Sequence, residues 1–349
     1  MSDTDPLPTV RLSDPGEIAA ALPYLMGFPP RESLVAVGLH DGRVGLTARI
    51  DLPAAAHRRT VVAGLVRSLL TDRPGAVLLA VVSEDDDAVD LTGAPDLPHR
   101  TLVHEAVLAF AAAEVAVPEV LLVRRGRWWS FDCPGSCCAP GAGTPLPAGT
   151  SPLAAASVAA GHVLEPDRAA LVRRLAPVRF LAAAGMARAC EEVGEEFARD
   201  TAARGWAAVA EESWSTLLAA VEASAPGTVE ALTDRQVARI AWGLRDVEVR
   251  DRALSLALGP SAPAAQAVWT ELTRRAPTPL DAAPATLVAV SAWVRGEGAL
   301  ASVALERALA SEPSYTFAGL LRSALDACLP PAQIRQLIRQ ADRPTGRRR

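Results

Sequence analysis

Three cysteines within six positions are the residues of this chain best suited to chemistry. Cys133, Cys137 and Cys138 lie in the stretch GRWWSFDCPGSCC. A soft cation such as zinc takes four ligands, so three thiolates would need a partner, for which His162 and His104 are candidates. Common structural zinc sites use two separated C-x2-C knuckles, whereas this pattern is C-x3-C-C without a second knuckle. Zinc is therefore one of several interpretations of the cluster.

The same thiols support two other interpretations. Neighbouring thiols resolve a sulfenic acid readily, so Cys133 could pair with Cys137 or Cys138 under oxidation. Alternatively, the small apolar cysteine side chains fill a tight Pro/Gly turn beneath tryptophans, since free cysteine is commonly buried. Because adjacent cysteines do not easily share one tetrahedral ion, the spacing favours the structural interpretation most.

The residues that flank the cysteines are candidates for ligand or interface contacts. Trp128 and Trp129 point to opposite faces if they lie on a strand. The pair would then serve either as a platform on which a ligand stacks or as a seal at a joint between domains. Their position before a Pro/Gly-rich boundary favours the seal. Arg127 and Asp132 are the polar candidates beside them, because a guanidinium group suits bidentate contacts with anions.

An acidic run, Glu84–Asp87, follows the apolar segment Ala76–Val82 after the single residue Ser83. Ligands and hard cations bind at the carboxyl ends of strands in α/β sheets, so this run could hold magnesium. Consecutive carboxylates cannot all face one ion, however, and acidic turns are usually solvated. The sequence favours a solvated turn here.

The chain contains neither lysine nor asparagine, so its 35 basic side chains are all arginine. This excludes Schiff-base and pyridoxal-phosphate chemistry, Walker-type phosphate loops and kinase-type catalysis, which all need a lysine. The sequence also lacks a G-x-S-x-G elbow, a glycine-rich dinucleotide fingerprint and an H-E-x-x-H motif. Whether the chain is an enzyme stays open on these grounds.

Charge and hydropathy narrow the partners and the compartment. A net charge of −5 makes a nucleic-acid partner unexpected, since binding to phosphates needs a concentrated basic surface. The start of the sequence lacks the blocks of a signal peptide, and apolar runs such as Ala76–Val82 are too short to cross a bilayer. We expect a cytoplasmic protein without membrane contact, whose thiols stay reduced.

Residues 10–147 are expected to form an α/β domain with a mixed sheet. A capped helix begins near Asp14, where Pro23 should kink or shorten it. Asp41–Gly42 between two apolar segments predicts a β-hairpin, and β/α units follow. The domain ends in a Trp/Cys-rich hairpin and loop.

Residues 150–335 are expected to form an all-α domain, with flexible ends at 1–9 and 340–349. Thr233–Gln236 is a capping box in front of an apolar stripe. The segment ASVALERALASEP resembles the second helix of a tetratricopeptide repeat, in which small residues allow close helix packing. A helical-hairpin, repeat-like domain follows from this pattern.

Three blocks of the chain resemble an uncharacterised actinobacterial family, domain of unknown function 4192. They are LSDPGEIAAALPYLMGFPPRESLVAVGL, GRWWSFDCPGSCC with the following GTPLP and SPLAAASVAAG, and GEGALASVALERALASEPSY. The resemblance covers nearly the whole chain. It implies an intracellular actinobacterial protein and brings neither an activity nor catalytic residues.

Together these features predict a cytoplasmic binding or regulatory protein. The helical domain would offer a surface to a protein partner, and the α/β domain would bind a small anionic ligand. The alternative is a metal- or thiol-dependent enzyme centred on Cys133, Cys137 and Cys138.

Overall fold

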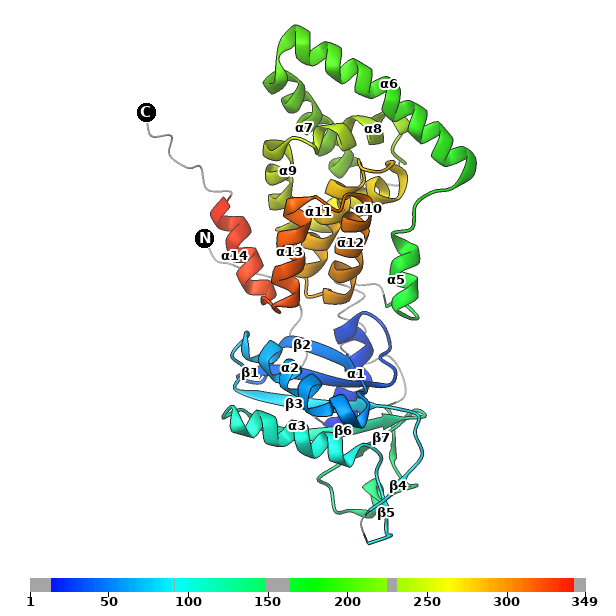
Figure 1. Ribbon diagram of the computed structural model, residues 1–349, viewed down its shortest axis with the longest axis vertical. Coiled ribbons are helices and arrows are strands. Elements are labelled where there is room, and N and C mark those ends of the chain that lie inside the picture. The colour runs from blue at the N-terminus through cyan, green and yellow to red at the C-terminus, as the bar shows by residue number, and fades with distance from the viewer. Residues whose placement is uncertain (1–13, 91, 148–163, 225–230, 342–349) are drawn as a thin grey trace. The chain divides into compact units, whose positions relative to one another are not determined.

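The chain divides into two compact units, Met1–Asp167 and Arg168–Arg349, in the computed structural model (Figure 1). The structure describes residues 14–90, 92–147, 164–224 and 231–341. The first unit is α/β with a mixed sheet and the second is all helical, which confirms the predicted fold class. His162 and the expected start of the all-α domain at residue 150 lie outside the described residues.

A six-stranded sheet in the order β2-β1-β3-β6-β7-β8 forms the centre of the α/β unit. Only the β3–β6 pair is parallel, and the other four neighbouring pairs are antiparallel. A separate two-stranded ribbon, β4-β5, precedes α3. The strands are β1 (Ser33–His40), β2 (Arg43–Asp51), β3 (Ala76–Val82), β4 (Ala88–Val89), β5 (Pro95–Asp96), β6 (Ala116–Arg124), β7 (Arg127–Ser130) and β8 (Thr144–Pro145).

Helices cover both faces of this sheet (Figure 1). The apolar side chains of α2 (Arg58–Leu70) and α3 (Arg100–Ala112) share one core with alternate residues of the strands. The intervening strand residues form a second core with α1 (Pro15–Met26). The central strands β1 and β3 are almost continuously apolar, as expected for strands that are buried on both faces. Pro23 does not shorten α1, which continues to Met26.

The β1–β2 hairpin has the predicted two-residue turn. Asp41 and Gly42 both have positive φ, 50° and 77°. His40 pairs with Arg43 across the turn. This backbone matches the twist of the flanking strands, which explains why Asp-Gly occurs there.

The helical unit is built around α11 (Ala282–Val294), whose residues are all buried. A three-residue turn connects it to α12 (Gly298–Ser311), and buried alanines of α12 allow the two helices to pack closely as a hairpin. The other helices are α5 (Arg168–Arg174), α6 (Phe180–Arg204), α7 (Trp206–Ala223), α8 (Asp234–Gly243), α9 (Val247–Leu254), α10 (Ala262–Arg275), α13 (Thr316–Asp326) and α14 (Pro331–Ala341).

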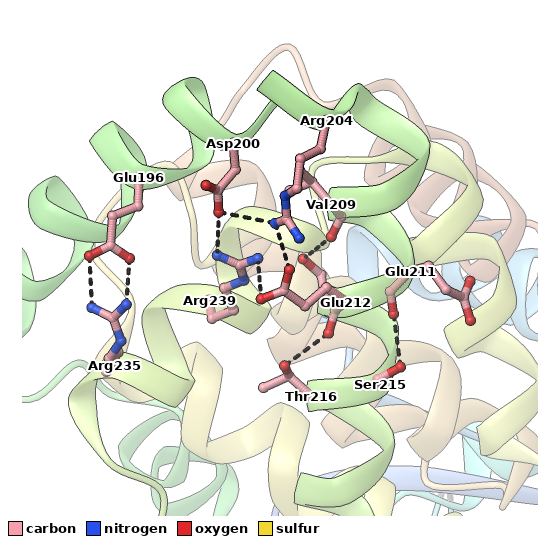
Figure 2. A network of polar contacts seen from close by, with 11 residues as sticks. Glu196, Asp200, Arg204, Val209, Glu211, Glu212, Ser215, Thr216, Arg235 and Arg239 are labelled. Carbon is pink, nitrogen blue, oxygen red and sulfur yellow. Dashed lines mark hydrogen bonds and ion pairs between the residues drawn. The ribbon is translucent and has the colours of Figure 1, made fainter. Parts of the chain in front are cut away.

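An ion-pair network connects α6, α7 and α8 (Figure 2). Arg239 of α8 lies 2.8 Å from Glu212 and 3.7 Å from Asp200, and Arg204 contacts the same two carboxylates. The predicted capping box at the start of α8 is present, with reciprocal bonds between Thr233 and Gln236. Polar contacts therefore fix the mutual position of three helices at one end of the unit.

No helix in the described parts of the chain is both long enough and apolar enough to cross a membrane.

Candidate thiolate site

The β6–β7 hairpin places the two tryptophans before the cysteines. Trp128 pairs with Val123 and Trp129 with Leu122 in the antiparallel ladder. The two rings face opposite sides of the sheet, as predicted: Trp129 lies in the core beneath α2 and α3, and Trp128 packs against the α1 core. Both tryptophans thus take part in the packing of the α/β unit itself.

Trp129 holds the loop that follows the cysteines. Its indole N–H donates to the Ala139 carbonyl at 3.2 Å, and the Arg124 guanidinium lies 4.7 Å from the ring centroid. Gly143 lies so close that a Cβ there would come within 2.4 Å of the ring. With 2% of its surface exposed, Trp129 has no free face for stacking on a ligand.

The three cysteine sulfurs converge. Cys137 Sγ lies 3.9 Å from Cys133 Sγ and 4.0 Å from Cys138 Sγ, and all three sulfurs lie within 4.8 Å of one another. A Zn–S bond of about 2.3 Å implies sulfurs about 3.8 Å apart in a tetrahedral site. The 3-10 turn Ser136–Cys138 brings the adjacent cysteines toward Cys133, which gives the three sulfurs the closeness that a shared cation would need.

The cysteines differ in burial and in their hydrogen bonds. Cys138 belongs to the sheet core, with 6% of its surface exposed, and accepts a bond from the Ser130 amide at 3.3 Å. Cys133 is half-buried and accepts from the Gly135 amide at 3.4 Å, whereas Cys137 is exposed. The cluster is therefore anchored in the core on one side and open on the other. Cys138 alone fits the expectation of a space-filling thiol.

The environment separates the pKa values of two of the thiols. Hydrogen bonds, above all from the Gly135 amide, lower the pKa of Cys133 below its ordinary value. Desolvation in the core raises the pKa of Cys138 to about 11. In the absence of a cation, Cys133 thus ionises more easily than Cys138.

The fourth ligand of such a site is not among the described residues, where only these three side chains form a metal-ligand cluster. Of the two candidates from the sequence, His162 lies outside the described part of the chain, and His104 is an exposed residue of α3 that does not belong to the cluster. Glu119 of β6 is the carboxylate whose charge acts on Cys133, and it accepts a 2.6 Å bond from the Ser130 hydroxyl.

The two polar candidates beside the tryptophans have different surroundings. Arg127 donates to the carbonyls of Ala142 and Gly143, at 3.2 and 2.7 Å, and so ties the loop back to β7. Asp132 is exposed, and its amide lies 3.4 Å from the Ser130 hydroxyl. Arg127 thus supports the loop that carries the cysteines.

Sequence reasoning missed that the acidic run lies against an arginine run. Arg124 pairs with Asp87 at 2.7 Å, and Arg125 pairs with Asp86 at 3.0 Å. The cause is the parallel pairing of β3 with β6, in which Val82 lies beside Val123, so that both strands end at the same edge. These carboxylates form ion pairs with guanidinium groups. No carboxylate cluster that could hold magnesium exists among the described residues.

A buried serine lies at that same edge. The Ser83 hydroxyl donates to Glu32 at 2.8 Å and lies 3.1 Å from His99 Nε2. Asp85 also contacts Nε2, at 3.1 Å. A Ser-His-Asp triad needs the carboxylate on the other ring nitrogen, so these contacts fix the edge of the sheet and do not form a nucleophile with its base.

Comparison with known proteins adds one match. A family model described as Domain of unknown function (DUF4192) matches residues 15–332. No curated protein and no solved structure matches the chain.

Proposed function

The chain belongs to the family described as Domain of unknown function (DUF4192), and we propose that it is a cytoplasmic binding or regulatory protein whose α/β unit binds a zinc-class cation. Cys133, Cys137 and Cys138 supply three thiolate ligands. The observation that carries the proposal is the convergence of their sulfurs within 4.8 Å.

The surroundings of the thiols support a bound cation. Thiolates are the ligands that zinc and other soft cations prefer, and no carboxylate among the described residues competes within the cluster. A cation bound to Cys138 would compensate for the desolvation that makes this thiol hard to ionise. A cytoplasmic location fits a cluster of thiolate ligands, because thiols are kept reduced in that compartment.

A regulatory role fits the position of the cluster. The cation would connect the exposed turn Ser136–Cys138 to the core beneath α2 and α3, since Cys138 belongs to both. Binding would thereby order the loop between β7 and β8. A protein partner for the helical unit and a small anionic ligand for the α/β unit stay predictions beside this proposal.

Metal analysis of the full chain tests the proposal. Protein purified without chelator should carry about one zinc per chain. The triple variant C133S/C137S/C138S should carry none, and the double variant C190S/C328S, which changes the two cysteines outside the cluster, should keep it. Cobalt substitution should give sulfur-to-metal charge-transfer absorption only when the cluster is intact.

Two results of the metal analysis would contradict the proposal. Wild-type protein without stoichiometric metal, combined with a melting temperature that does not change on chelation or on addition of zinc, would refute a metal-binding role. Equal metal content in the triple variant would place the metal elsewhere.

A metal-dependent enzyme is the second candidate, because the described residues supply only three ligands. Catalytic zinc sites typically have three protein ligands and keep the fourth position for water. The exposure of Cys137 places that position within reach of solvent. If a water occupies it, the visible absorption of the cobalt-substituted protein should change with pH as the water ionises. Absorption that does not change with pH would favour a closed, structural site.

A further inference from the structure

We propose that Cys133 and Cys137 are a thiol-oxidation site, in which a hydroperoxide converts the pair into a disulfide while Cys138 stays a thiol. The release of a cation by this reaction rests on the proposed function, whereas the disulfide itself rests on the geometry of the loop alone. The site would act as an oxidation-sensitive control of metal occupancy.

The geometry of the loop favours a disulfide between Cys133 and Cys137 over the two possible disulfides that include Cys138. The sulfurs of Cys133 and Cys137 lie 3.9 Å apart, and a disulfide of about 2.05 Å requires only a small movement of an exposed loop. Cys138 is held in the sheet core with 6% exposure and by the Ser130 amide, so it cannot follow without disturbing the core. Adjacent residues such as Cys137 and Cys138 would close a strained ring of minimal size.

Gly135 leaves space beside the two sulfurs. A Cβ at this position would lie 3.3 Å from Cys133 Sγ and 3.4 Å from Cys137 Sγ. Its backbone is extended, with φ −75° and ψ 155°, so alanine is compatible with the conformation. A methyl group here would therefore act on the sulfurs themselves and leave the backbone unstrained.

The chemistry balances with one hydroperoxide. The Cys133 thiolate attacks one peroxide oxygen, the O–O bond breaks, and the leaving oxygen takes a proton to become water or an alcohol. The Cys137 thiol then attacks the sulfenic sulfur, the S–S bond forms, and the hydroxyl leaves as water with the proton of that thiol. Two thiols are oxidised by two electrons and the peroxide is reduced.

Mass spectrometry of the oxidised full chain tests the pairing. Two samples, one treated with chelator and one loaded with zinc, are exposed to hydrogen peroxide. The remaining thiols in each sample are then blocked with N-ethylmaleimide. Because the chain has no lysine, trypsin leaves all three cysteines in the single peptide 128–168. This peptide should contain one disulfide and one maleimide, and fragmentation should locate the maleimide on Cys138.

Variants separate the roles of the three residues. C138S should still form the disulfide, C137S should not, and G135A should form it about tenfold more slowly. S136A is the matched control at the neighbouring exposed position and should react like wild type. Circular dichroism verifies that each variant folds. If C138S does not fold, the position of the maleimide in the wild-type peptide shows whether Cys138 takes part in the disulfide.

The two proposals can fail separately. Disulfide formation in a protein that binds no zinc would refute the metal-binding function and retain the oxidation site. Zinc binding without a Cys133–Cys137 disulfide, or a disulfide that includes Cys138, would overturn the oxidation site and leave the metal function intact. In zinc-loaded protein, a chromogenic chelator should detect zinc release in step with the disulfide.

Discussion

At the scale of single residues, two glycines in the loop beside Trp129 separate backbone strain from steric clash. Gly141 and Gly143 have nearly the same φ, 74° and 73°, but only Gly143 lies against the indole ring. We expect G141A to cost about 1 kcal/mol through the positive φ alone. G143A should cost about 2 kcal/mol more, because its methyl group displaces Trp129.

Urea unfolding of the two glycine variants measures this difference. Equal losses in G141A and G143A would mean that the ring moves aside freely and does not fix the loop. Zinc content measured on the same samples shows whether the position of Trp129 matters for the cysteines. We expect it to fall in G143A only.

The cysteines show what residue spacing alone can and cannot predict. Their types and proximity identified the cluster, and the tryptophan pair was correctly placed on opposite faces of a strand. The spacing argued against a shared cation because it was compared with two-knuckle sites. The 3-10 turn Ser136–Cys138, which brings the adjacent sulfurs together, has no distinctive sequence signal beyond its Pro/Gly setting.

At the scale of secondary-structure elements, two arginines of α8 offer a matched pair. Arg239 is 11% exposed and contacts Glu212 and Asp200 on neighbouring helices, whereas Arg235 is 66% exposed and pairs with Glu196 (Figure 2). R239M should cost on the order of 2 kcal/mol, because it removes a nearly buried guanidinium that joins two helices and leaves Arg204 as the remaining charge partner of Glu212 and Asp200.

R235M is the control, and it should change stability little because exposed pairs are weak. Chemical denaturation of both variants at low and high salt checks this contrast, and only the R235M effect should vanish in salt. Similar losses in both would show that burial does not set the strength of this network.

The buried carboxylate at the start of α11 predicts a pH dependence. Asp281 is fully buried, pairs with Arg307 at 2.5 Å and accepts a hydrogen bond from the Ser311 hydroxyl. Desolvation raises the pKa of Asp281 above its ordinary 3.8. The folded state therefore holds this proton more tightly, so the associated stability is present below pH 3.8 and is lost as pH rises through the folded-state pKa.

Comparison of wild type with D281N separates the contribution of Asp281 to the pH dependence of stability from that of the other carboxylates. The unfolding free energy of wild type relative to D281N should decrease as pH rises from about 4 toward neutrality. Urea unfolding at several pH values measures it. A difference that stays constant, or one that grows with pH, would mean that the ion pair with Arg307 outweighs desolvation.

Element pairing explains why one contact escaped prediction. The hairpin at Asp41–Gly42 and the capping box at Thr233 are local, and their sequence signals were sufficient. The acidic run after β3 meets the arginines at the end of β6 only because these two strands are parallel neighbours. No local pattern encodes that adjacency, so the sequence did not predict the ion pairs, although Glu84, Asp85 and Asp86 are exposed as expected for a solvated turn.

At the scale of the whole molecule, the composition anticipated two units with different architectures. Continuous apolar strands between helices indicated a sheet buried on both faces, and the later helical periodicity indicated a helix-only unit. Each unit has its own hydrophobic core, so each is expected to unfold as a cooperative unit of its own. A cation bound in one unit should then stabilise that unit specifically.

Segment-resolved hydrogen exchange of the full chain tests this separation. Zinc at a hundred times its dissociation constant should stabilise the α/β unit by about 2.7 kcal/mol. Amides of β6, β7 and α3 should exchange more slowly with zinc than with chelator, whereas those of α10, α11 and α12 should exchange at the same rate. Slowing in the helical unit would mean that the cation couples the two units, and a regulatory signal could then pass from the thiols to the helices.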